Sequence, residues 1–351
     1  MDPFLGSVLT FAEAKREPAV VCIEVTHRCN LRCAHCYNPP ASGAYRDSRA
    51  ELSTGSIIEI IRSVLYPGRT AICFTGGEPL CRKDIETFIK TAHRRKFANI
   101  HLDTNGVLLT ANVARLLKKA GLGSAQISLD GLRDAHDKRR GRGCFDKVTE
   151  NIASAVAWGI RVTVNMTIDS SNVEEVAALY QLSSGLGAYQ FKVEPMLAKG
   201  RAAGKDFGDL SPEIIKKTCE QIRLISPNNG TALALDNLYE AAMSGEKTLG
   251  CPSSRSFCHI TKEGRMFHCP VFTEFAGEGE DVTGGRFAQV WRASGFMQKM
   301  RDPETYREAC GDCAHLAECC GGCHARAAIA TGSFFGRDPM CQVLNKRREA
   351  P

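Results

Sequence analysis

Short apolar runs alternate with longer amphipathic segments over the first two thirds of the chain. The apolar runs predict six strands, at 20–26, 70–75, 98–104, 124–130, 160–168 and 188–194. The segments between them predict helices near 55–66, 82–96, 110–120, 145–158 and 172–185. Strands separated by helices of this length indicate βαβ units and a parallel sheet. Six units are fewer than the eight of a closed barrel, so the pattern predicts an α/β fold with an open or partial barrel.

The character of the chain changes near residue 200. A glycine-containing linker at 200–204 precedes a predicted helix at 211–225, and beyond 250 the chain is rich in cysteine and glycine. The segment 259–268 predicts a hairpin that turns at Glu263-Gly264. A region with so little apolar sequence needs another source of stability, and metal ligation is available. We therefore expect four segments: a leader (1–19), a barrel (20–200), a bridging helical region (201–250) and a small cysteine-rich cluster-binding domain (251–351).

Composition narrows the class of protein. The chain has 351 residues, 43% of them hydrophobic, and a net charge of +6. Its basic clusters are short, and we interpret them as solvated helix ends rather than a nucleic-acid-binding surface. No apolar stretch approaches the ~20 residues of a membrane span, and the amino terminus lacks the basic-then-apolar order of a signal peptide. We expect a cytoplasmic protein with neither a nucleic-acid nor a membrane partner.

Cysteine usage points to metal chemistry. The chain has 17 cysteines, of which three fall at 29–36 and nine at 251–341. Without a secretory signal, disulfides are the weaker interpretation and metal or cluster ligation the stronger one. The five remaining cysteines are expected to be small buried apolar residues: Cys22, Cys73, Cys81, Cys144 and Cys219.

The first group, Cys29-x3-Cys33-x2-Cys36, directly follows the first predicted strand. Three thiolates leave one iron of a [4Fe–4S] cube without a protein ligand, and an open iron favours catalysis over electron transfer alone. Half of a zinc site is the alternative, although structural zinc prefers four ligands. In parallel sheets ligands gather at the carboxyl ends of the strands. Further chemistry-bearing residues follow the next three strands: Gly76-Gly77-Glu78-Pro79, Thr104-Asn105-Gly106 and Asp130-Gly131.

The triplet, with Tyr37 after its last cysteine and Gly76-Gly77-Glu78-Pro79 after the second strand, resembles the radical S-adenosylmethionine (radical SAM) superfamily. The resemblance implies a partial (β/α)6 barrel, which agrees with the six units above. It also implies that the open iron binds S-adenosylmethionine, and that an electron from the cluster cleaves it to methionine and a 5′-deoxyadenosyl radical. That radical abstracts a hydrogen atom from the substrate.

The same resemblance implies a set of cofactor contacts. Gly76 to Pro79 would face the methionine amino group, where close backbone approach needs glycine and Glu78 offers charge. Ser128 and Asn165 would contact ribose or carboxylate, and the planar fork of Arg140 would hold the cofactor's carboxylate. The alternatives are a simple strand-to-helix turn at Gly76–Pro79 and surface or capping roles for the other three residues.

The second cysteine group resembles the SPASM extension of radical SAM enzymes. Its seven matching cysteines are Cys251, Cys269, Cys310, Cys313, Cys319, Cys323 and Cys341, and Cys258 supplies an eighth ligand candidate. The family pattern implies two auxiliary [4Fe–4S] clusters, three in all with the first. One auxiliary cluster would be held by Cys251, Cys258, Cys269 and Cys323, and the other by Cys310, Cys313, Cys319 and Cys341. Two four-cysteine zinc sites are the alternative.

Two cysteines are left without a role. Cys320 adjoins Cys319 and is interpreted as an inert neighbour, with a substitute ligand or a hydrogen-atom donor as alternatives. Cys144 is a second unassigned thiol of the same kind.

Three functions remain open at this stage. In the first, the enzyme modifies a ribosomally made peptide by crosslinking or epimerisation; in the second, it oxidises or epimerises a small molecule such as an aminoglycoside or sugar. The third is a non-catalytic iron–sulfur electron-transfer protein. Only about 20 residues precede the first strand, so the peptide function calls for a separate recognition protein. The resemblance also implies an electron donor such as flavodoxin or ferredoxin.

Overall fold

The computed structural model describes residues 18–38, 51–203, 212–225, 230–236, 251, 253, 255–272 and 279–341. Strands and helices alternate through the first two thirds of the chain, as predicted. The strands of this part are β1 (Val20–Thr26), β2 (Ala71–Gly76), β3 (Asn99–Thr104), β4 (Ser124–Ser128), β5 (Arg161–Ile168), β6 (Gln190–Pro195) and β7 (Ala232–Leu235). The helices are α2 (Thr54–Ser63), α3 (Ile85–Arg94), α4 (Ala111–Ala120), α5 (Arg133–Arg140), α6 (Cys144–Ala157), α7 (Val176–Gly185) and α8 (Pro212–Arg223). Short 3-10 turns lie at Pro79–Cys81, Val173–Glu175 and Gly200–Ala202.

Helix α5 was not predicted from the sequence. Its residues, RDAHDKRR, include a single apolar side chain, so they lack the apolar stripe by which a helix is recognised. Tertiary contacts compensate: His136 and Arg139 on this helix are buried. The helix matters here because its last residue, Arg140, was predicted to contact the cofactor.

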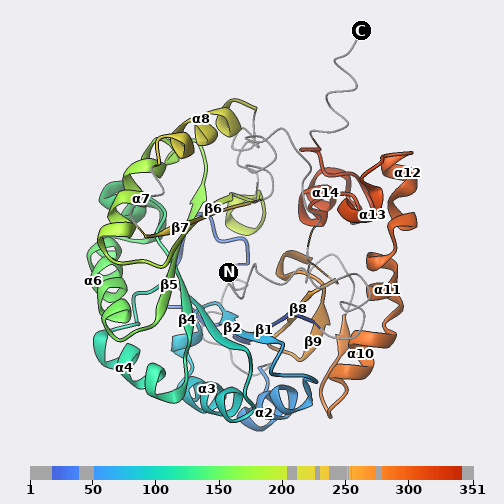
Figure 1. Ribbon diagram of the computed structural model, residues 1–351, viewed down its shortest axis with the longest axis horizontal. Helices are drawn as coiled ribbons and strands as arrows, with labels where there is room; N and C mark the ends of the chain where they lie inside the picture. The colour runs from blue at the N-terminus through green and yellow to red at the C-terminus, as the bar shows by residue number, and fades with distance from the viewer. Residues whose placement is uncertain are drawn as a thin grey trace.

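One ten-stranded sheet organises the molecule. Its strand order is β10-β9-β8-β1-β2-β3-β4-β5-β6-β7, and β1 to β7 pair in parallel with their neighbours. Helices α2, α3, α4, α6, α7 and α8 cover the outer face of this curved sheet (Figure 1). The parallel α/β architecture with a partial barrel is confirmed.

The cysteine-rich region extends the same sheet. Strand β8 (Phe257–Ile260) pairs in parallel with β1, and β9 (Arg265–Phe267) returns antiparallel to β8 through a turn at Gly264, φ +81°. This hairpin has the predicted position and turn. A two-residue strand, β10 (Glu280–Asp281), pairs with β9. The boundary proposed at 250/251 stays a prediction, since β-sheet hydrogen bonds join the two sides.

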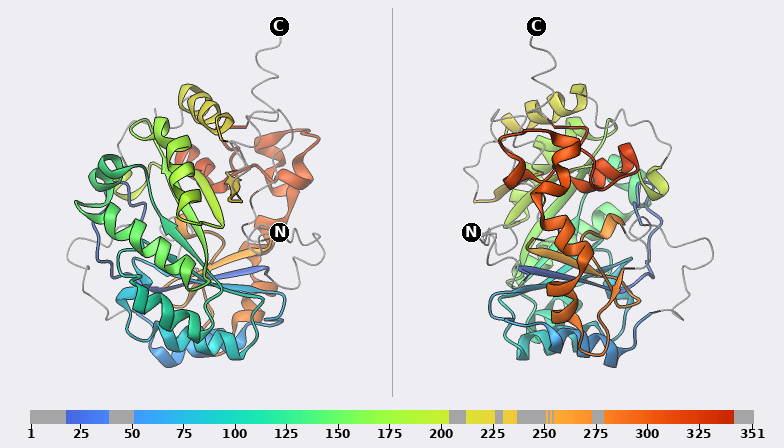
Figure 2. Two further views of the ribbon diagram at one scale, coloured as in Figure 1. Left: turned by 60° about the vertical axis from the view of Figure 1, so that its left-hand side comes forward. Right: turned by 90° about the vertical axis from the view of Figure 1, so that its right-hand side faces the viewer.

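The last described segment is built from short helices. They are η7 (Pro270–Phe272), α10 (Phe287–Ala293), α11 (Gly295–Arg301), η8 (Pro303–Tyr306), α12 (Arg307–Cys310), α13 (Leu316–Cys319) and α14 (His324–Thr331). Figure 2 shows these helices, orange to red, stacked along one side of the molecule. Their apolar clusters are small: Tyr306, Leu316 and Cys320 form one, and Val271, Ala325 and Ala328 another. Such small cores fit the expectation that ligation stabilises this region.

Strand alternation separates two kinds of side chain. Val21, Ile23 and Val25 of β1 belong to the main hydrophobic core, as do residues of α2 and α3. Cys22 and Glu24 of the same strand point to the opposite, inner face of the sheet. Polar groups therefore gather on the inner face, toward which the functional candidates lie. No helix among the described residues is long and apolar enough to cross a membrane.

Candidate active site

The cysteine triplet forms a loop at the carboxyl end of β1. Cys33 is buried, whereas Cys29 and Cys36 are half-buried. The Leu31 N–H lies 3.4 Å from Cys29 Sγ, and the Cys36 N–H donates to the Cys33 carbonyl at 3.3 Å. Burial raises the pKa of Cys29 to about 12 and also raises that of Cys36. Thiols in such a setting become thiolates only beside a cation, which fits metal ligands.

The spacing of these sulfur atoms bears on which metal centre fits. Two ligand atoms bonded to one zinc ion at about 2.3 Å lie at most about 4.6 Å apart. Among the described residues, one group of His, Cys, Asp or Glu side chains has three ligand atoms within 4.8 Å of one another, and it contains neither the triplet nor any SPASM-type cysteine. Among the described residues, the triplet and the SPASM-type cysteines are thus spaced more widely than three ligands of one ion, and ligands distributed over the irons of a cluster are also spaced more widely.

The glycines after β2 allow this loop and the cysteine loop to touch. The Gly77 N–H donates to the Thr26 carbonyl and the Glu78 N–H to the Arg28 carbonyl, both at 2.8 Å. A Cβ on Gly76 (φ +144°) would lie 2.1 Å from the Thr26 oxygen, and one on Gly77 2.5 Å from the Arg28 oxygen. Glycine is therefore required because the backbone after β1 approaches so closely.

Glu78 is fully buried between loops. Its carboxylate accepts hydrogen bonds from the Thr104 hydroxyl (2.8 Å), the Asn105 N–H (2.8 Å) and the Leu80 N–H (3.0 Å). Burial raises the pKa of Glu78 to about 7, although these donors lower it. The side chain thus ties the loop after β2 to the loop after β3, while Pro79 begins the short turn that follows. Asn105 in turn points its amide toward Cys29 Sγ, at 3.9 Å.

Arg140 lies beside the triplet. Its Nη1 is 3.8 Å from Cys33 Sγ, and its Nε donates to Asp130 Oδ2 at 2.5 Å. Asp130 also approaches His35 Nε2 (3.1 Å) and accepts the Thr167 N–H (3.0 Å). Burial raises the pKa of Asp130, but Arg140 and His35 outweigh it and hold that pKa well below its usual range. Sequence reasoning noted Asp130 only as a strand-end residue, because the ion pair depends on the unpredicted helix α5.

Ser128 and Asn165 stand side by side. They are partners in the register of β4 and β5, so both side chains project from the same face. Asn165 is buried, and its Oδ1 has no hydrogen-bond partner among the described residues. An unpartnered buried acceptor next to a hydroxyl is the kind of group that a ligand satisfies.

Tyr37 connects the triplet to the cysteine-rich region. It follows Cys36 directly, and Glu24 and Cys269 both lie within electrostatic range of its hydroxyl. The residue keeps 39% of its surface exposed. Tyr37 therefore stands between the two cysteine-bearing parts of the chain, beside the inner face of the sheet.

The SPASM-type cysteines gather in two sets. Burial raises the pKa of Cys269, and Cys251 and Cys323 lie close enough to raise it further. Around Cys310 lie the other members of the second set, Cys313, Cys319 and Cys341. Cys323 therefore lies near the first set and Cys341 near the second, and the assignment of these sets to two clusters stays a prediction.

Cys258 lies apart from the first set. It sits on β8 beside Val21 of β1, fully buried within the main hydrophobic core. Its electrostatic neighbours among the described residues are Cys22 and Arg301, not Cys251, Cys269 or Cys323. The strand alternation explains the difference, because Cys258 points to the helix-covered face. Cys258 therefore stands apart from the other three cysteines expected to hold the first auxiliary cluster.

Cys320 and Cys144, the two unassigned thiols, have local protein partners. Cys320 adopts a left-handed backbone (φ +47°), is buried, and accepts a hydrogen bond from Arg255 Nη2 at 2.5 Å. Cys251 lies within its electrostatic range. Cys144 Sγ points to the Arg140 carbonyl at 3.9 Å.

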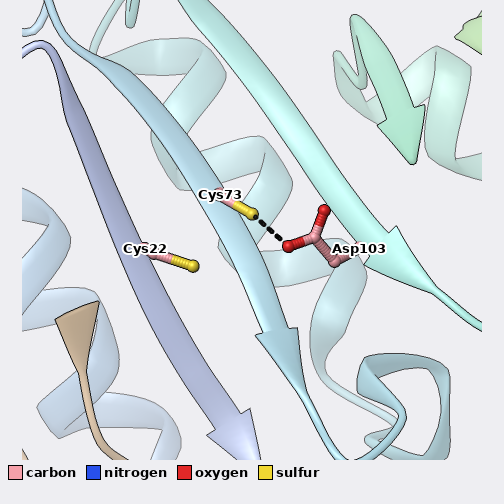
Figure 3. A group of neighbouring side chains, drawn as sticks. All are labelled: Cys22, Cys73 and Asp103. Atoms are coloured by element: carbon pink, nitrogen blue, oxygen red, sulfur yellow. Dashed lines mark hydrogen bonds between the residues drawn. The ribbon is translucent and has the colours of Figure 1, made fainter. Parts of the chain in front are cut away.

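The structure also brings together residues that sequence reasoning treated as inert. Cys22, Cys73 and Asp103, on three neighbouring strands, form the close group of ligand atoms noted above (Figure 3). A single sequence offers no signal for this group, because the three residues lie on separate strands with long segments between them.

Comparison with known families identifies the class of protein. Residues 23–182 match the family described as the Radical SAM superfamily. The chain belongs to this superfamily, whose members bind S-adenosylmethionine and a [4Fe–4S] cluster. The recognition made from the motifs is thereby confirmed.

Relatives that align over most of this chain belong to the same class of S-adenosylmethionine-dependent enzymes and maturases. The chain is 28% identical over 347 residues to an AdoMet-dependent heme synthase of Methanosarcina barkeri, covering 92% of this chain and 96% of that protein. It is 30% identical over 339 residues to the mycofactocin maturase MftC of Mycobacterium tuberculosis, covering 92% and 83%. The solved structure of Streptococcus suis SuiB bound to S-adenosylmethionine superposes with a TM-score of 0.73 at 18% identity, covering 93% and 78%. Native anSMEcpe with bound AdoMet gives a TM-score of 0.70 at 17% identity, covering 94% and 95%.

Proposed function

We propose that this radical SAM enzyme matures a ribosomally made peptide, with its C-terminal region acting as a SPASM domain. When bound, the cluster and S-adenosylmethionine supply a 5′-deoxyadenosyl radical that abstracts a substrate hydrogen atom. Cys29, Cys33 and Cys36 hold that cluster, Ser128 and Asn165 contact the cofactor, and Arg140 directs its charge toward Cys33. The relative MftC is a maturase, and SuiB has been solved with the precursor peptide SuiA.

The charged side chains on the inner face of the sheet favour one class of substrate over the other. The partly exposed ionisable side chains of this face include Asp103, Lys192 and Glu194, and Lys192 Nζ is already paired with Glu194 Oε1 at 2.6 Å. Buried Glu24 adds a carboxylate that is paired with His259, whose Nε2 lies 3.7 Å from Glu24 Oε2. The basic groups of this face are each already paired with a carboxylate, so among the described residues it offers no surplus positive charge for the several carboxylates of a haem precursor. A peptide, which offers amide groups and few charges, does not need such positive charge.

A tetrapyrrole is the second candidate, favoured by one observation. The heme synthase of Methanosarcina barkeri aligns over 96% of its own length with this chain. The enzyme would then oxidise a haem precursor, which falls within the small-molecule alternative.

One assay separates the two candidates. The anaerobically reconstituted enzyme is incubated with S-adenosylmethionine, dithionite and either a precursor peptide encoded beside its gene or iron-coproporphyrin III. We expect 5′-deoxyadenosine to form faster with the peptide, and the peptide to change mass, with any neighbouring recognition protein added. Stimulation by the porphyrin alone would transfer the function to the second candidate. Absence of 5′-deoxyadenosine under all conditions would favour a pure electron-transfer protein.

The reduced ligand set of the first auxiliary cluster yields a separate prediction. We propose that Cys251, Cys269 and Cys323 hold this cluster without Cys258. A Cys269→Ala/Cys323→Ala variant is expected to lose about four of about twelve irons per chain, since one [4Fe–4S] cluster is lost. Cys258→Ala, the matched control, should keep all of them. Iron and sulfide analysis measures the cluster content of both variants. An equal loss of iron in Cys258→Ala would show that Cys258 is a cluster ligand.

A further inference from the structure

Three neighbouring strands bring two thiols and a carboxylate together on the inner face of the sheet. Cys22 of β1 is in register with Cys73 of β2, and Asp103 lies on β3 (Figure 3). Their ligand atoms all lie within 4.8 Å of one another, and Cys73 Sγ is 3.3 Å from Asp103 Oδ2. None of these residues belongs to the triplet or to the SPASM-type sets.

The spacing is that of ligands around a single ion. Atoms bonded to one zinc at 2.0–2.3 Å lie at most about 4.6 Å apart, so only a slight contraction brings all three atoms into range. Thiolates are soft ligands that select zinc over magnesium or calcium, and a carboxylate oxygen is a common third zinc ligand. Both cysteines are almost fully buried, at 5% and 1% exposure, so bulk water does not compete for the ion.

Further side chains support the group from both sides. His101 Nε2 lies 3.2 Å from Asp103 Oδ1, while its Nδ1 lies 2.7 Å from the Ser124 hydroxyl oxygen. The contacts from Ser124 through His101 to Asp103 fix the carboxylate so that Oδ2 faces the thiols. Outer partners play the same role around metal ligands.

On the other side, His259 of β8 is 2% exposed and adjoins Cys22. Its Nε2 lies 3.7 Å from Glu24 Oε2, an ion pair too long for a hydrogen bond, and neither its ring nitrogens nor Glu24 Oε1 have a hydrogen-bond partner among the described residues. A buried polar atom without a partner costs about 1–3 kcal/mol. These atoms border the thiol pair, where a bound ion and its fourth ligand would give them a hydrogen-bond partner.

We propose that Cys22, Cys73 and Asp103 bind one zinc ion. On binding, each thiol releases its proton to solvent and the sulfur bonds to the ion, with no change in oxidation state. Three protein ligands leave a fourth position, as in zinc sites that bind a water or substrate oxygen. That position lies on the inner face of the sheet, which Tyr37 also borders. The site is independent of which substrate the enzyme modifies.

The test uses the full chain with its iron–sulfur clusters filled, equilibrated with zinc chloride and then freed of loosely held metal. Zinc and iron per chain are measured by mass spectrometry, and the zinc environment by X-ray absorption. We expect one zinc per chain with a shell of two sulfurs at about 2.3 Å plus oxygen or nitrogen. A shell of four sulfurs would place the zinc in a cluster position and overturn the proposal, as would absence of retained zinc.

Variants locate the site. Cys22→Ser/Cys73→Ser should lose the zinc while keeping its iron, and Cys219→Ser, a buried thiol on α8, should keep both metals. If the double variant fails to fold, Asp103→Asn preserves both thiols and is expected to weaken zinc affinity about tenfold or more. Unchanged zinc affinity in Asp103→Asn, or zinc retained by a folded double variant, would show that these residues are packed polar groups without an ion.

Discussion

A variant with Cys29, Cys33 and Cys36 replaced by alanine is expected to retain about eight irons per chain and to form no 5′-deoxyadenosine. One [4Fe–4S] cluster is lost with the triplet, and about eight irons correspond to two auxiliary clusters. Cleavage fails because the chain then has no site for a cluster with an open iron at the carboxyl end of β1. Iron analysis and chromatography of the reaction products measure the two effects.

Cys219→Ala is the matched control for this variant. Its thiol is buried on α8 within the hydrophobic core, and its charged neighbours are Arg223 and Glu220 rather than other cysteines. This variant should keep about twelve irons and full cleavage. If the triple variant still cleaved S-adenosylmethionine, the assignment of the triplet would be wrong.

Replacing Asp130 with alanine is expected to lower the free energy of unfolding by about 3–5 kcal/mol, the usual cost of removing one partner from a buried ion pair. The substitution leaves the guanidinium of Arg140 buried without its carboxylate, next to His35. Urea denaturation followed by circular dichroism measures the loss. Asp146→Ala removes an exposed carboxylate that pairs with Arg133, and it should leave the unfolding curve nearly unchanged because exposed pairs contribute little.

The difference in free energy of unfolding between wild type and Asp130→Ala should depend on pH in a defined direction. The folded-state pKa of Asp130 lies well below the ordinary value of 3.8. Its stabilising contribution is therefore fully present above that ordinary value, and it disappears as the pH falls toward the folded-state pKa. The gap in free energy of unfolding between wild type and Asp130→Ala should not shrink between pH 8 and 5, and should shrink only in stronger acid. A gap that closes near pH 6 would show that Asp130 is not held ionised by Arg140.

Much of the fold follows from local sequence. The first six strands are apolar runs bounded by turns, and their helices carry apolar stripes, so periodicity is enough to find them. Helix α5 is the exception. Its buried residues, His136 and Arg139, are polar, so no apolar stripe marks the helix in the sequence. Strand β8 is short, and its pairing with β1 depends on residues more than 200 positions away, which periodicity does not reveal.

The residues of the candidate site also fall into two groups, those that local sequence identifies and those that only the folded structure brings together. Spacing along the chain identifies the triplet and the glycines after β2, since their ligands and turns are local. The position of Cys258 depends on which face of β8 it occupies, and a one-residue difference decides this. The Arg140–Asp130 pair and the Cys22–Cys73–Asp103 group arise from neighbouring elements, so only the three-dimensional arrangement reveals them.

The parallel pairing of β8 with β1 has a consequence for how the protein can be divided. Without β8, the strand that precedes the triplet would be an exposed edge, with a row of free N–H and C=O groups along Val20 to Ile23. A fragment ending before residue 251 is therefore expected to self-associate. The same hydrogen bonds fix the first strand of the hairpin that leads to Cys269 against the strand that leads to Cys29. Electron transfer between the two regions would then occur across a span set by the backbone of the sheet, independent of how the surrounding loops move.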